Sequence, residues 1–244
     1  MADEELRVTP IQSASLVDVL VQRLLALIVS GAVKPGQRLR EERLTAQFGV
    51  SRPPLREALR ILERDGVIKR LPRRGVIVAP LGADDIREIY TLRWALEKLA
   101  LELAMPLDDP GRLDPLRAAL EQIRRAADSG DLEALVEANL AFHLAVCALP
   151  GHSRLLATYR TLTHQLRVYM AANLRFRQSV LADPQDSVRR HERLLALIAS
   201  GDLDAVRREI EEHGDRAFLS ELAAPPAAPE AGTRGGSATA ASEP

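Results

Sequence analysis

The stretch "SRPPLREALRILERDG", residues 51–66, predicts a short helix with two different faces. At about 100° per residue, Leu55 and the apolar residues that follow it at helical spacing share one side, which we expect to pack on a core. The other side carries an arginine at every fourth position: Arg52, Arg56, Arg60 and Arg64. Two prolines start the helix abruptly, because the first turn needs no N–H from them. The arginine stripe is either an ordinary solvated face or a surface that binds a partner.

The neighbouring segments favour a binding surface. A helix over roughly 15–30 and a short helix in "LREERLTAQFG", residues 39–49, precede the stretch, and two short alternating runs around a basic turn follow it as a β-hairpin. Three helices and a hairpin form a winged helix-turn-helix, whose third helix presents its N-terminal side chains to the major groove of DNA. The predicted DNA-binding residues are Arg43, Ser51, Arg52, Arg56, Arg73, Arg74 and Gly75.

The distribution of charge supports this assignment. Residues 1–80 hold 14 Lys and Arg against 9 Asp and Glu, a net charge of +5, whereas residues 81–244 hold 19 against 25, a net charge of −6. A compact basic segment on an acidic body indicates a module that binds a polyanion, attached to a part with another task.

Composition bounds the class of protein. The 244 residues are 46% hydrophobic and 27% charged, which is typical of a soluble globular protein. One cysteine, Cys147, excludes an intramolecular disulfide and fits a reducing compartment. No apolar leader and no membrane-length apolar run is found, so we expect a cytoplasmic protein with no membrane partner.

Strand signals disappear after residue 82, and six amphipathic segments with Gly, Pro, Asp or Ser at their ends predict a six-helix bundle. The expected fold is therefore mainly α. Its parts are a winged helix-turn-helix DNA-binding domain over residues 1–80, an all-α effector-binding and dimerisation domain over residues 81–222, and a disordered Pro/Gly/Ala-rich tail over residues 223–244.

Three histidines in the bundle have a suggestive spacing. Asn139 and His143 are four residues apart and share a helix face, while His191 and His213 lie on two helices joined by a tight turn. Three imidazoles and one amide oxygen meeting at one point would suit a divalent transition metal such as Zn, Ni or Mn. The alternative is that each histidine is placed independently, with no ligand role.

Residues 30–78, "SGAVKPGQRLREERLTAQFGVSRPPLREALRILERDGVIKRLPRRGVIV", resemble the DNA-binding domain of the GntR family of bacterial transcription regulators. The resemblance implies that Arg43, Arg52, Arg56 and Gly75 contact an operator. The chain departs from the family at Pro53, where a hydroxyl residue is frequent, and this departure bears on the operator sequence.

Residues 84–220 resemble the FCD domain of the FadR-like subfamily, through "LRWALEKLALELA", "NLAFHLAV" and "HERLLALIASGDLDAVRREIEEH". The resemblance implies a metal held by Asn139, His143, His191 and His213, with Asn139 standing where many members have Asp and forming a weaker ligand. It also implies a small organic acid as effector. Arg93 is the candidate to pair with its carboxylate, although an interhelical or interdomain salt bridge would explain this residue equally well. The other pocket candidates are Tyr90, Arg167, Tyr169 and Asn173.

Two functions of different class follow. The first is a metabolite-responsive DNA-binding regulator, a repressor that binds a palindromic operator as a homodimer. The second is a metal-dependent enzyme with an accessory nucleic-acid-binding domain. The sequence holds no HExxH, nucleophile elbow or P-loop, and the regulator explains both halves of the chain. We therefore expect no enzymatic activity.

Overall fold

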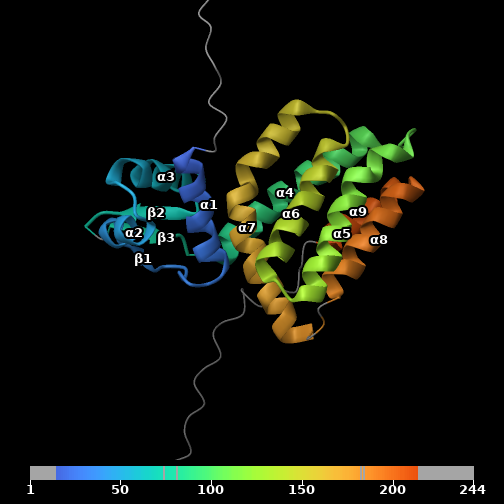
Figure 1. The fold of residues 1–244 in the computed structure, drawn as a ribbon. Coiled ribbons are helices and arrows are strands. Elements are labelled where there is room, and N and C mark those ends of the chain that lie inside the picture. Colours follow the sequence, from blue (N-terminus) through green and yellow to red (C-terminus); the bar gives the residue numbers. More distant parts are fainter. Residues whose placement is uncertain (1–14, 74, 81, 182, 184, 214–244) are drawn as a thin grey trace, which may run out of the picture.

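The computed structural model describes residues 15–73, 75–80, 82–181, 183 and 185–213, without the side chains of residues 83, 176–181 and 211–213. Within these residues a small α/β domain lies beside a bundle of helices (Figure 1). No helix of this part of the chain is long and apolar enough to cross a membrane. The expected tail, residues 223–244, lies outside the described residues.

The small domain is the expected winged helix-turn-helix. Its elements are α1 (Leu16–Val29), β1 (Arg38–Leu39), α2 (Glu41–Phe48), α3 (Arg52–Arg64), β2 (Ile68–Leu71) and β3 (Gly75–Val78). The three strands form an antiparallel sheet in the order β1-β3-β2, with Lys69 opposite Ile77 in the hairpin. The sequence predicted the hairpin and missed β1, because a two-residue strand has no periodicity to detect.

The two-faced character of α3 is confirmed. Leu55, Ala58, Leu59 and Leu62 are fully buried, and they pack with α1 and the sheet in one apolar core. The arginines of the opposite side are exposed. Truncation of a leucine in such a core costs about 2–5 kcal/mol, so this face fixes the helix in place.

The six predicted helices of the bundle are present, with one 3₁₀ turn, η1 (Pro110–Leu113), ahead of the second. They are α4 (Ala83–Ala104), α5 (Asp114–Ser129), α6 (Leu132–Ala148), α7 (Ser153–Leu181), α8 (Asp186–Ser200) and α9 (Leu203–His213). Gly130 and Gly201 end α5 and α8 in the left-handed conformation that favours glycine. Asp131 begins α6 by accepting a hydrogen bond from the N–H of Ala134.

The two domains meet mainly along α7, which runs beside α1 in Figure 1. Val168 of α7 is buried in the core of the winged domain rather than in that of the bundle. Arg167 continues the contact, because its guanidinium donates to Gln22 of α1 and pairs with Glu137 of α6. A bundle helix therefore completes the core of the DNA-binding domain.

Candidate DNA interface and buried effector site

The start of α3 stands clear of the protein. Gly49 ends α2 with φ 66°, and Pro53 and Pro54 occupy the first turn of α3 two residues after Ser51. The Ser51 side chain makes no capping hydrogen bond to this turn. Its hydroxyl and the exposed Arg52 thus face solvent at the end of the helix that enters a DNA groove in helix-turn-helix proteins.

The arginine stripe is divided by its ion pairs. Arg56 Nε lies 2.8 Å from Glu41 Oε2 on α2, and Arg60 and Arg64 pair with neighbouring carboxylates on or beside α3. No ion pair of Arg52 or Arg43 occurs among the described residues. Exposed pairs contribute little stability, so a phosphate can replace the carboxylate partner of Arg56 at small cost.

The wing, the turn between β2 and β3, holds two residues with positive φ. Gly75 has φ 77°, and Arg73 has φ 62°, a conformation that costs about 1 kcal/mol for a residue with a side chain. A Cβ atom added to Gly75 would lie 3.4 Å from Nε and Nη2 of Arg38. Arg38 is thus a third basic residue at the wing, and the sequence did not reveal it because β1 brings it there. Arg74 lies outside the described residues.

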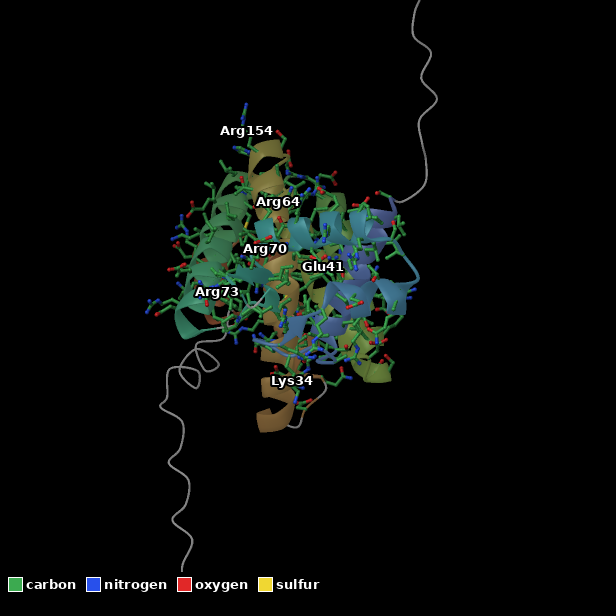
Figure 2. All side chains as sticks on the ribbon, turned by 90° about the vertical axis from the view of Figure 1, so that its left-hand side faces the viewer. Lys34, Glu41, Arg64, Arg70, Arg73 and Arg154 are labelled. Atoms are coloured by element: carbon green, nitrogen blue, oxygen red, sulfur yellow. The ribbon has the colours of Figure 1, made fainter. Side chains whose placement is uncertain are left out.

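Figure 2 views the molecule from the side of the winged domain, with Arg64, Arg70, Arg73 and Lys34 labelled on it together with Glu41. Basic side chains of α3, of the wing and of the loop before β1 share this half of the molecule. The surface offers guanidinium groups for phosphates and base edges, which supply affinity and specificity respectively.

A second group of charged residues is buried in the bundle. We call Arg93, Glu97, His143 and Tyr159 the Arg93 cluster; Arg93 and Glu97 are 3% and 1% exposed. Glu97 Oε1 accepts hydrogen bonds from Arg93 Nε and from the Tyr159 hydroxyl, each over 2.8 Å, and His143 Nδ1 lies 3.2 Å from the same oxygen. The second arm of Arg93, Nη2, lies 2.6 Å from His143 Nε2. The ion pair of Arg93 lies within α4 and is neither interhelical nor interdomain, whereas its contact with His143 reaches α6.

Burial and charge shift the titration of this cluster. Burial alone would raise the pKa of Glu97, but the charge of Arg93, the interaction with His143 and the hydrogen bonds together outweigh burial and lower this pKa to about 2. Burial and the charge of Arg93 lower the pKa of His143. A guanidinium has only donors, so Nε2 of His143 must accept from Arg93 while Nδ1–H faces Glu97. His143 is therefore a neutral imidazole of one defined tautomer.

The structure brings three of the four predicted metal ligands together. The rings of His143 and His191 are 5.3 Å apart between centroids. Ser187 links Asn139 to His191, because its hydroxyl donates to Asn139 Oδ1 over 3.3 Å and its carbonyl lies 2.7 Å from His191 Nδ1. His213 is the last residue of α9, and its side chain lies outside the described part of the chain.

The orientation of His191 suits a metal ligand, whereas the described residues alone do not complete a metal site. His191 donates Nδ1–H to a carbonyl, which places the lone pair on Nε2 and is the usual orientation of a metal-binding histidine. The described residues contain no group of three or more His, Cys, Asp or Glu side chains close enough to hold a metal. In this structure, moreover, Nε2 of His143 accepts from Arg93.

A small cavity adjoins the Arg93 cluster. Its volume is about 20 Å³, enough for one water molecule, and its lining includes Tyr90, Arg93, Asn139, His143, Asn173 and Arg190. Asn173 donates to the Tyr90 hydroxyl over 3.3 Å, while its own buried carbonyl oxygen has no hydrogen-bond partner among the described residues. Tyr169 packs edge-on against Tyr90, with ring centroids 4.3 Å apart. Of the predicted pocket residues, only Arg167 lies elsewhere, at the domain interface.

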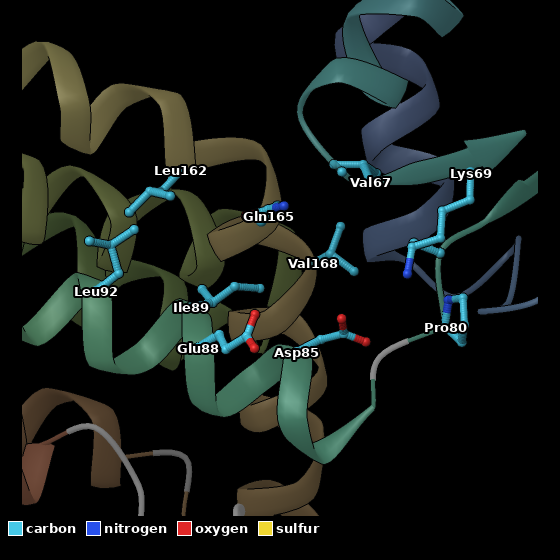
Figure 3. Close-up of a pocket in the computed structure, with 12 residues that line it drawn as sticks. Val67, Lys69, Pro80, Asp85, Glu88, Ile89, Leu92, Leu162, Gln165 and Val168 are labelled. Carbon is cyan, nitrogen blue, oxygen red and sulfur yellow. The ribbon is translucent and has the colours of Figure 1, made fainter.

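One helix connects this site with the DNA-binding domain. On α7, Tyr159 and Asn173 face the buried site, whereas His164 lies with Nδ1 2.7 Å from Oδ2 of Asp65, the residue that ends α3. A cavity of about 270 Å³ separates α4 and α7 from the hairpin; Figure 3 shows Leu162, Gln165 and Val168 lining it from the bundle and Val67, Lys69 and Pro80 from the winged domain. Sequence reasoning did not find Glu97, Tyr159 or His164, although Glu97 follows Arg93 by four residues, the spacing of an ion pair along a helix.

Comparison with known proteins agrees with this architecture. Residues 16–78 match the family of bacterial regulatory proteins named gntR, and residues 88–216 match the FCD domain. The chain is 32% identical over 197 residues to the HTH-type transcriptional regulator YdhC of Bacillus subtilis, covering 78% of this chain and 84% of YdhC. It is 28% identical over 189 residues to the gluconate operon transcriptional repressor of Bacillus licheniformis, covering 77% of each.

A solved structure agrees in fold and sequence. The chain is similar to McbR (YncC) of Escherichia coli, with 28% identity and a TM-score of 0.68, over 87% of this chain and 100% of that one. These relatives are regulators and not enzymes, which excludes the metal-dependent enzyme as the function of the chain. The protein belongs to the GntR family, as a DNA-binding transcriptional regulator with a C-terminal FCD domain.

Proposed function

We propose that this regulator represses transcription from a palindromic operator, which it binds as a homodimer in the cytoplasm, and that a small carboxylate bound in the bundle changes its affinity for DNA. One observation carries the proposal: α7 lines the buried polar site with one face and holds the winged domain with the other. A shift of α7 caused at one of these faces then changes the contacts at the other face, which is the condition for allosteric coupling between the two sites. The similar protein of Bacillus licheniformis is the transcriptional repressor of a gluconate operon, which supports repression as the activity of this chain.

In the proposed complex the start of α3 enters the major groove. Ser51, Arg52 and Arg56 reach base edges or phosphates there, Arg43 contacts the backbone from α2, and the wing contributes Arg73, Arg74 and Gly75. Arg38 joins this set because of its position against Gly75. Arginine paired with guanine supplies specificity, since two donors match O6 and N7.

The effector site is proposed to be the small cavity beside the Arg93 cluster. Arg93 would hold the ligand carboxylate through two N–H groups, and the amide of Asn173 would orient it beside the aromatic wall of Tyr90 and Tyr169. Asn139, His143, His191 and His213 would hold a divalent metal, which supplies a positive charge for the carboxylate. A larger ligand enters only if the site opens, and opening shifts α7.

A second copy of the chain is the proposed partner of α4. Leu92, Leu99 and Leu103 are 44%, 43% and 53% exposed, and their spacing of seven and four residues places them on one face of α4, with the half-buried Leu96 between them. We call these four residues the leucine stripe. An exposed apolar row of this kind is typical of an interface, and a two-fold axis through it would bring two winged domains to one operator.

The direct test of DNA reading begins with selection of binding sequences from random duplexes by the purified protein. The selected sites should contain an inverted repeat. Arg52→Ala should weaken binding to a selected duplex by about 1–3 kcal/mol and relax the preference at one position in each half-site. The matched control is Arg160→Ala, which removes an exposed arginine of α7 and should leave binding unchanged. Equal binding by both variants would contradict the assignment of α3.

A further inference from the structure

The contact between Arg93 and His143 conflicts with metal binding at the same nitrogen. Nη2 of Arg93 lies 2.6 Å from Nε2 of His143, and Nδ1 of His143 faces Glu97 Oε1 at 3.2 Å. A neutral imidazole has one lone pair, which is used once it accepts from Arg93. The same lone pair would be needed to bind a metal, and a second positive charge beside the guanidinium would be repelled. His143 therefore cannot serve both Arg93 and a metal.

Arg93 cannot simply leave this position. It is 3% exposed, so a guanidinium that gave up His143 would lose a charge-assisted hydrogen bond without gaining water. Its Nε is tied to Glu97 at 2.8 Å, and Arg93 lines the small cavity together with Asn139 and Asn173. A carboxylate that enters as this cavity opens would give Nη2 of Arg93 a new acceptor, and Arg93 could turn away from His143 while keeping its contact with Glu97.

We propose that Arg93 is a gate: without ligand it keeps a metal off His143, and a carboxylate that takes its guanidinium opens the site to the metal. This inference rests on the proposed effector function of the bundle and adds its regulation. Metal and carboxylate then bind with positive cooperativity, each raising the affinity for the other by the same factor. The gate would make the response depend on the metabolite even when the metal is abundant.

The test compares Ni²⁺ affinities by calorimetry on the full-length, metal-free protein. Arg93→Met combined with Glu97→Gln removes both members of the buried ion pair, so no unpaired carboxylate remains to attract the metal or to unfold the protein. We expect this variant to bind Ni²⁺ roughly ten- to a hundredfold more tightly than the unmodified protein. This factor corresponds to the free energy of the one hydrogen bond to a charged group that the metal no longer has to break. Addition of His143→Gln to this variant should abolish its increased affinity for Ni²⁺.

Two controls separate the gate from general electrostatics. Arg190→Met combined with Asp186→Asn removes another arginine of the same cavity together with the carboxylate that it pairs with at 3.2 Å, and it should change Ni²⁺ affinity much less. Acetate should tighten Ni²⁺ binding by the unmodified protein but not by the Arg93→Met/Glu97→Gln variant, and uncharged acetamide should affect neither.

The outcomes distinguish this inference from the proposed function. If the unmodified protein binds Ni²⁺ as tightly as the Arg93→Met/Glu97→Gln variant, or if the Arg190→Met/Asp186→Asn variant has an equal effect, the gate is wrong and the metal site stands. If acetate leaves the affinity unchanged, the carboxylate does not open the gate. If neither protein binds Ni²⁺, the gate and the metal site are both wrong, while repression through the winged domain is unaffected.

Discussion

Glu97 Oε1 accepts hydrogen bonds from Arg93 of α4 and Tyr159 of α7, and His143 Nδ1 of α6 lies 3.2 Å from the same oxygen. A buried carboxylate is stable only when it is paired, and a change to any donor therefore reaches the other helices. Burial and the nearby negative charge of Glu97 raise the pKa of the Tyr159 hydroxyl, which stays protonated and donates at every physiological pH. At the scale of single residues, the site is a network in which Glu97 holds three helices at a fixed separation.

The two buried histidines predict how stability depends on pH. Burial lowers the pKa of His143 and lowers that of His191 well below its ordinary value of 6.5. Below pH 6.5 the unfolded chain therefore binds protons that the folded chain does not, and stability is lost as the pH falls. For each histidine the slope approaches about 1.4 kcal/mol per pH unit between its lowered folded-state pKa and 6.5.

The check is denaturant unfolding between pH 7 and pH 5. His143→Gln combined with His191→Gln should lower stability at pH 7 and flatten its decline toward pH 5. His152→Gln, at an exposed position, is the matched control and should keep the slope of the unmodified protein. Equal slopes in all three proteins would show that the histidines do not stay neutral in the folded state.

At the scale of helices and strands, sequence patterns were informative where one periodicity ran over several turns. The apolar row from Leu55 to Leu62 and the prolines before it predicted α3 and its two faces, and similar rows predicted the bundle. A two-residue strand and a 3₁₀ turn have no such signal. The Arg93 cluster escaped prediction because Tyr159 lies 62 residues from Glu97, and only packing brings them together. Spacing did place Asn139 and His143 on one face, because four residues make about one helical turn.

The position of Val168 predicts that α7 couples the two domains. This side chain is buried in the core of the winged domain although it belongs to the bundle. Val168→Asp should place an unpaired charge in that core, release the winged domain from α7 and separate thermal unfolding into two transitions. The exposed neighbour Thr161→Asp should keep a single transition. A single transition in the Val168 variant, with an unchanged midpoint, would mean that α7 does not hold the winged domain.

At the scale of the whole molecule, a basic winged domain is joined to an acidic helical bundle. This arrangement supports the proposal that two copies bind one operator. One winged domain offers a single recognition helix and a single wing, which contact one half-site. Within this domain, carboxylates pair with Arg56, Arg60 and Arg64, so the net positive charge that the domain presents to DNA is reduced. Tight binding at physiological salt then requires the contacts of two domains held at the spacing of the operator halves.

The leucine stripe on α4 predicts where the two copies meet. Burial of a leucine contributes about 1.5–3 kcal/mol, so three exposed leucines from each copy would make a substantial apolar centre for an interface. Leu99→Glu should oppose two carboxylates across the two-fold axis, and this like-charge contact should convert the dimer to a monomer at micromolar concentration in sedimentation velocity. Leu16→Glu changes an equally exposed leucine of α1 outside the stripe and should leave the dimer intact. The Leu99 variant should still bind a single half-site weakly but lose its preference for the inverted repeat. A dimer that survives Leu99→Glu with its operator affinity unchanged would place the interface on another surface.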